Sequence, residues 1–96
     1  MITVTKKDNY IYIKGHAGSA QYGKDIVCAA CSSIIYTTIN ALKRINAFSI
    51  EVVDKKDMQI RIIENDEITG ILIDNMLELL ISLENQYPKN IRVKES

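Results

Sequence analysis

The sequence predicts an α+β fold of two layers, an antiparallel β-sheet with two helices packed on it, in the order ββαββα with a possible last short strand. Four short segments alternate apolar and polar residues or are rich in β-branched residues, which is typical of strands. Two longer segments repeat their apolar residues at helical spacing. One helix follows each pair of strands, and strands joined by tight turns pair antiparallel. The length of 96 residues and the 47% apolar content predict a single domain over residues 1–96 with a modest core.

The first half of the chain predicts a hairpin, a loop and a helix. Residues 2–5 and 10–13 are the two strands, and Asp8-Asn9 is the turn between them. Residues 15–24 contain three glycines and three other small residues, which predicts a loop. Asp25 is a favourable N-cap for the helix that follows, which continues to about Ile45.

The second half repeats this order. Residues 48–54 are rich in aromatic and β-branched residues and predict a third strand, and residues 58–62 alternate and predict a fourth. A second helix is expected from about Asp66 to Tyr87, stopped by Pro88. Ile91 and Val93 suggest the short last strand.

The second predicted helix carries more apolar surface than one buried face requires. Its two neighbouring stripes consist of Ile68, Leu72, Met76, Leu79, Leu80 and Leu83, and of Ile73, Leu77 and Ile81. They cover an arc of roughly 200°, whereas a surface helix needs about 100°. We therefore expect the extra stripe to bury a partner subunit in a two-fold homodimer. The other interpretation is that this helix is central in its own domain.

Composition and charge limit the partners. Twelve basic and twelve acidic residues give a net charge of zero, and the basic pairs are scattered along the chain. Phosphate binding needs clustered Lys and Arg, so no direct contact with nucleic acid is expected. The N-terminus lacks a signal-peptide pattern and no apolar run looks long enough to span a bilayer, which predicts a cytoplasmic protein without membrane contact. Thiols stay reduced in that compartment.

One stretch carries residues suited to nucleophilic catalysis. His16 is the sole histidine and ends the second strand, and Cys28 lies twelve residues later in the first turn of the first helix. The unpaired N–H groups and positive dipole end of a first turn favour a thiolate. A histidine within reach would complete an activated pair. Each residue also has a structural interpretation, His16 as a surface residue and Cys28 as a small buried one.

Two polar residues flank this pair. Asp25 is by default a cap, but it could also raise the thiol pKa or orient His16. Ser32 follows Cys28 by four residues, so the two share a face of the helix. Ser32 could hydrogen-bond in the site or back to its own helix.

Cys28 and Cys31 also have the spacing of a dithiol redox motif. In that motif the first Cys normally begins the helix, whereas this helix is expected to begin three residues earlier. Cys31 then falls on the apolar stripe and is interpreted as a core residue. Two thiols and one histidine make a poor zinc site, so no metal is expected.

The stretch resembles the Prp family of ribosomal-processing cysteine proteases. The matching residues are Gly15-His16-Ala17, Gly23, Asp25-Ile26-Val27-Cys28-Ala29-Ala30 and Ser32, which is eleven positions within eighteen. The resemblance implies that His16 is the general base and Cys28 the nucleophile, with Asp25 and Ser32 as supporting polar residues. Gly15, Ala17 and Gly23 would belong to a substrate-binding loop that moves as a lid.

The resemblance also implies the reaction and the partners. Members of the family remove a short N-terminal extension from the large-subunit ribosomal protein L-twenty-seven, act as homodimers and need no metal or organic cofactor. Two other functions remain open from the residues: a non-catalytic module that binds the ribosomal protein, and a thiol–disulfide oxidoreductase that uses Cys28 and Cys31.

Overall fold

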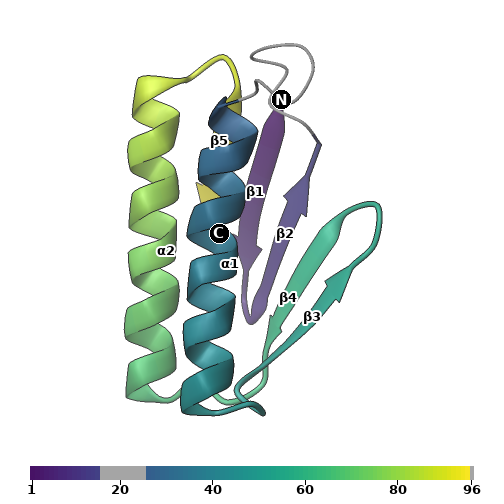
Figure 1. The fold of residues 1–96 in the computed structure, drawn as a ribbon, viewed down its shortest axis with the longest axis vertical. Coiled ribbons are helices and arrows are strands. Elements are labelled where there is room, and N and C mark those ends of the chain that lie inside the picture. Colours follow the sequence, from purple (N-terminus) through teal and green to yellow (C-terminus); the bar gives the residue numbers. More distant parts are fainter. Residues whose placement is uncertain (16–25, 96) are drawn as a thin grey trace.

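The elements of the computed structural model follow the predicted order. The structure describes residues 1–15 and 26–95. The elements are β1 (Ile2–Lys7), β2 (Tyr10–Lys14), α1 (Ile26–Ile45), β3 (Ile50–Asp54), β4 (Met58–Ile62), α2 (Glu67–Gln86) and β5 (Ile91–Glu95) (Figure 1). The predicted α+β class is confirmed, and the possible last strand is present as β5.

The five strands form one sheet in the order β3-β4-β2-β1-β5. The pairs β1–β2, β2–β4 and β3–β4 are antiparallel, as expected. β5 differs, because it runs parallel to β1 and makes the sheet mixed. The physical reason is that α2 returns the chain to the end of the sheet where β1 begins. The backbone N–H of Ile2 donates there to the carbonyl oxygen of Asn90, at 2.9 Å.

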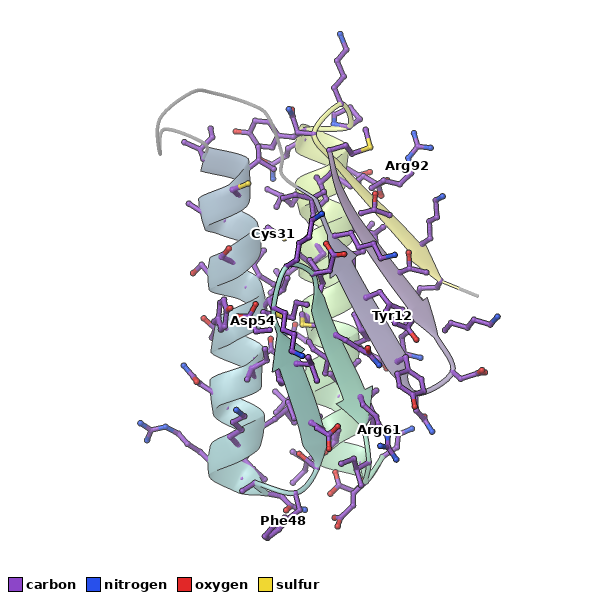
Figure 2. All side chains as sticks on the ribbon, turned by 90° about the vertical axis from the view of Figure 1, so that its right-hand side faces the viewer. Tyr12, Cys31, Phe48, Asp54, Arg61 and Arg92 are labelled. Atoms are coloured by element: carbon purple, nitrogen blue, oxygen red, sulfur yellow. The ribbon has the colours of Figure 1, made fainter. Side chains whose placement is uncertain are left out.

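The two helices lie side by side on one face of the sheet, and in the part of the chain that the structure describes no helix covers the other face (Figures 1 and 2). The core lies between these layers. The sheet contributes to it the buried residues Ile2, Val4, Ile11, Ile50, Ile60, Ile62 and Ile91. The helices contribute Val27, Cys31, Ile35, Ile39 and Leu42 from α1 and Ile73, Met76, Leu77, Leu80 and Leu83 from α2.

The apolar character of α1 has its explanation in this core. With 20 residues and a mean hydropathy of 1.4, α1 is long and apolar enough to cross a membrane, which the apolar-run criterion missed. Its buried residues recur every three or four positions and face the sheet and α2. The opposite side exposes polar residues such as Ser33, Thr37 and Asn40. This amphipathic pattern is that of a core helix in a folded domain.

The ends of α2 agree with the predicted ends. The side chain of Asp66 accepts a hydrogen bond from the backbone N–H of Thr69 at 2.8 Å and caps the N-terminus. Tyr87 is the C-cap and Pro88 follows it. The broad apolar arc is only partly buried, because Ile68, Leu79 and Ile81 are exposed.

The third strand begins two residues later than predicted. Asn46 accepts a hydrogen bond from the backbone N–H of Phe48 through its side chain at 3.0 Å, and its carbonyl oxygen accepts the Ser49 hydroxyl at 2.9 Å. These bonds hold residues 46–49 in a turn. Phe48 therefore lies outside the strand with 77% of its surface exposed.

Candidate active site

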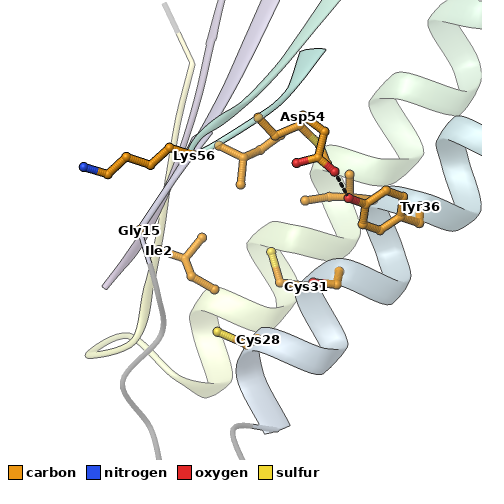
Figure 3. A pocket seen from close by; sticks show the side chains of 11 residues that line it. Ile2, Gly15, Cys28, Cys31, Tyr36, Asp54 and Lys56 are labelled. Atoms are coloured by element: carbon orange, nitrogen blue, oxygen red, sulfur yellow. Dashed lines mark hydrogen bonds between the residues drawn. The ribbon is translucent and has the colours of Figure 1, made fainter. Parts of the chain in front are cut away.

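A cavity of about 250 Å³ lies between the first half of α1 and the sheet (Figure 3). Three segments that are distant in the sequence form its wall: α1, the ends of β1 and β2, and the β3–β4 hairpin. The lining residues are Ile2, Ile13, Gly15, Cys28, Cys31, Ser32, Ile35, Tyr36, Asp54, Lys56 and Met58. The cavity thus has an apolar floor from the core and a polar rim.

Cys28 lies at the predicted position, as the third residue of α1. Its side chain is half-buried and lines the cavity on the side of the helix that faces the sheet (Figure 3). The first helical turn leaves N–H groups without an intrahelical partner and carries the positive end of the helix dipole. Both stabilise a thiolate, which is the nucleophilic form of cysteine.

Cys31 lines the same cavity one turn later but in a different environment. Only 2% of its surface is exposed, which confirms the interpretation of Cys31 as a core residue. Burial, together with the neighbouring Cys28 thiol, raises the pKa of Cys31 from 9.0 to about 11. Cys31 is therefore a protonated thiol at neutral pH and a poor nucleophile. Cys28 is the better placed of the two thiols to attack a substrate in the cavity.

Ser32 is exposed and lines the cavity together with Cys28, so the predicted shared face is confirmed. Gly15 lies at the end of β2 with a φ of 85°, in the left-handed region that favours glycine. A Cβ at this position would collide with the backbone carbonyl oxygen of Met1. Glycine is therefore required at this position, directly after β2 and directly before His16 in the sequence.

Four predicted site residues, His16, Ala17, Gly23 and Asp25, lie outside the described residues. The pairing of His16 with Cys28, the role of Asp25 as a cap and the moving loop therefore stay predictions. Within residues 1–15 and 26–95, no three His, Cys, Asp or Glu side chains gather as a metal site would require.

Tyr36 and Asp54 also line the cavity, although the sequence did not predict either as a site residue. The Tyr36 hydroxyl donates a hydrogen bond to the Asp54 carboxylate, and this bond raises the pKa of Tyr36 (Figure 3). It connects the exposed side of α1 to the end of β3 at the rim of the cavity. The one signal in the sequence was the spacing of Tyr36, which is two helical turns from Cys28 and one from Ser32.

Comparison with known proteins identifies one family, both by a family model and by similar proteins. The family model described as cysteine protease Prp matches residues 1–92. The ribosomal processing cysteine protease Prp of Mycoplasma genitalium is 30% identical over 98 residues, which covers 99% of this chain and 96% of that protein. The protein of the same name from Staphylococcus aureus is 28% identical over 87 residues, or 86% of this chain and 82% of its own length.

The fold matches as well. The crystal structure of the essential ribosomal processing protease Prp from S. aureus, in complex with a covalently linked product peptide, superposes with a TM-score of 0.91 at 28% identity and covers 100% of both chains. Since the match extends over nearly every residue in sequence and over the whole chain in structure, this chain belongs to the Prp family and is a cysteine protease.

Proposed function

We propose that this protease removes the N-terminal extension of the ribosomal protein L-twenty-seven in the cytoplasm, as a step of ribosome assembly. The observation that carries the proposal is the position of Cys28, half-buried at the start of α1 in the wall of the cavity. Relatives of similar length are ribosomal processing proteases, and one of them holds a covalently linked product peptide. The apolar floor and polar rim of the cavity suit a peptide that presents both side chains and backbone groups.

The proposed reaction is acyl transfer through a thioester. His16 takes the proton from the Cys28 Sγ atom, and the thiolate attacks the scissile carbonyl carbon. N–H groups at the start of α1 stabilise the oxyanion. The C–N bond breaks as His16 returns the proton to the leaving amine. Water then attacks the thioester, again with His16 as base, and releases the Cys28 thiol.

The other motif residues have supporting roles in this proposal. Asp25 caps α1 or orients His16, and Ser32 hydrogen-bonds within the cavity. Gly15, Ala17 and Gly23 belong to the substrate-binding loop in this proposal, and the loop closes over the peptide.

We also propose a homodimer that buries the outer side of α2. Ile68, Leu72 and Leu79 fall within about 40° of one another around this helix, given 100° per residue. Ile68 and Leu79 are exposed, although both are large and apolar. Light scattering at micromolar concentration is expected to give the mass of two chains, and Leu79→Glu that of one chain. A wild-type protein with the mass of one chain would remove the homodimer from the proposal.

The experiment that tests the reaction is cleavage of a peptide copying the N-terminal extension, by the wild type, Cys28→Ala and Cys31→Ser. The proposal expects cleavage by the wild type and by Cys31→Ser, and none by Cys28→Ala. No cleavage by the wild type, together with reduction of a disulfide substrate that Cys31→Ser abolishes, would instead favour a thiol–disulfide oxidoreductase. Binding of the peptide without cleavage by fresh, reduced wild type would favour a non-catalytic module.

A further inference from the structure

The face of the sheet opposite the helices has a composition that the sequence did not reveal. Residues of each strand that alternate with the buried ones point to this face. The strand register places Thr5 beside Tyr12 and Lys94, Thr3 beside Lys14 and Arg92, and Tyr10 beside Lys7 and Arg61. Tyr12, Arg61 and Arg92 are visible on the sheet face turned to the viewer in Figure 2.

Positive charge is concentrated on this face although the whole chain is neutral. Its cations are Lys7, Lys14, Arg61, Arg92 and Lys94, and its carboxylate is Glu51, next to Arg61. In the helical layer α2 has the opposite charge, because it carries Glu67, Asp74, Glu78 and Glu84 and no basic residue, whereas α1 carries Lys43 and Arg44 in its last turn. The fold therefore separates charges that are scattered along the chain, and the field over the open sheet face attracts a polyanion.

Aromatic rings lie among these cations. Tyr10 and Tyr12 follow each other on the outer face of β2, with ring centroids 5.9 Å apart and planes inclined by 12°. Both side chains remain partly exposed. Tyr12 also forms, with Thr3, Thr5 and Lys14, the wall of a shallow open depression of about 400 Å³. Exposed, stacked rings on a sheet can extend their stack with an unpaired base.

We propose that the open sheet face binds a single-stranded nucleic acid, with bases stacked on Tyr10 and Tyr12 and phosphates bound by the surrounding cations. Charge complementarity identifies a polyanion, and the ring pair distinguishes an unpaired nucleotide strand from an acidic peptide or a duplex, whose bases are already stacked. This proposal departs from the expectation of no nucleic-acid contact, which rested on the total charge and on the scatter of the basic pairs in the sequence. The inference is independent of the proposed substrate.

The residues of this face alternate with those that line the cavity, so the nucleic acid and the peptide would occupy opposite sides of the sheet. Ile2, Ile13 and Met58 line the cavity, whereas their strand neighbours Thr3, Lys14 and Gln59 belong to the outer face. Variants of the outer face are therefore expected to keep the peptidase activity of the wild type. That activity serves as the check that each variant is folded.

The test is fluorescence anisotropy of a labelled uridine-rich 12-mer, with duplex RNA and an oligoglutamate as competitors. We expect saturable binding. The logarithm of the association constant should fall with the logarithm of the salt concentration with a slope of about −2, as for three phosphate contacts on a single strand. Tyr12→Ala and the double variant Arg61→Gln/Arg92→Gln should each weaken binding about tenfold. The matched controls Phe48→Ala and Lys43→Gln change an exposed aromatic and an exposed cation elsewhere. Both should bind as the wild type does.

The same base sequence tested as RNA and as DNA distinguishes the two sources of a single strand, and tighter binding of either one supports the proposal. Three results would overturn it. The first is no saturable binding of either strand, and the second is an equal loss of affinity in the control variants. The third is that oligoglutamate competes as well as the unlabelled 12-mer does. The last result would make the face a site for acidic peptides.

Discussion

The Tyr36 hydroxyl on α1 and the Asp54 carboxylate at the end of β3 form a hydrogen bond across the rim of the cavity that contains Cys28. The bond connects the helix that carries Cys28 to the β3–β4 hairpin, which supplies Lys56 and Met58 to the same wall. It is a side-chain hydrogen bond between two elements that are eighteen residues apart at this point. The shape of the cavity therefore depends on a contact that lies outside the catalytic motif.

Removing this hydrogen bond is expected to affect substrate binding more than chemistry. Tyr36→Phe keeps the ring but loses the donor, and an exposed hydrogen bond contributes about 1 kcal/mol. We expect the KM for the extension peptide to rise about three- to tenfold with little change in kcat. Steady-state kinetics check this, with Tyr87→Phe as the control for loss of a tyrosine hydroxyl outside the cavity. Unchanged kinetics in Tyr36→Phe would show that the hairpin is held by its backbone alone.

The two cysteines are expected to differ in their reaction with an alkylating agent. Cys31 is buried and its pKa is raised to about 11, so a very small fraction is thiolate at neutral pH. Limited iodoacetamide at pH 7.5 should therefore label Cys28 at least tenfold faster than Cys31, as measured by peptide mass spectrometry. Labelling in denaturant gives the control, in which both thiols react alike. Preferential labelling of Cys31 in the native protein would contradict its assignment as a core residue.

Gly15→Ala tests how the chain is positioned before His16. The φ of 85° costs an L-residue about 1 kcal/mol, and the added Cβ meets the carbonyl oxygen of Met1. We expect a folded variant with a modest loss of stability and at least a tenfold lower kcat, because the backbone next to the proposed base must shift. Circular dichroism and peptide cleavage separate the two effects. As a control, Gly70→Ala in α2, where a Cβ meets no atom closer than 3.6 Å, should retain activity.

The pH dependence of stability is expected to include a contribution from Asp66. The hydrogen bond from the Thr69 backbone N–H, and then that from its side chain, lowers the pKa of Asp66 below 3.8. The carboxylate is thus favoured in the fold, and the stabilisation is present above pH 3.8 and lost as the pH falls through the lower folded value. Thermal unfolding should show that the difference in Tm between wild type and Asp66→Ala grows from pH 2.5 to pH 5. A difference that is independent of pH would contradict this role of the charge.

The sequence by itself determined the elements and where Cys28 lies within one of them. Alternation in β1, β2 and β4, the cap at Asp66 and the stop at Pro88 are local signals, and local backbone preferences are strong enough to decide them. The same holds for the third-residue position of Cys28 in α1, because it follows from the helix start alone. The pairing of Cys28 with His16 is a prediction from the motif.

The tertiary structure alone decided which distant residues meet. The parallel pairing of β5 with β1 and the bond between Tyr36 and Asp54 join residues separated by at least eighteen positions. The cations of the outer sheet face come together from four strands, β1, β2, β4 and β5. No local preference encodes such contacts, because they depend on strand order and on the burial of both helices on one side. A neutral chain with scattered charges therefore becomes a molecule with a basic sheet face and an acidic second helix, since the hydrophobic pattern dictates which residues face inward and the charges occupy the positions that remain.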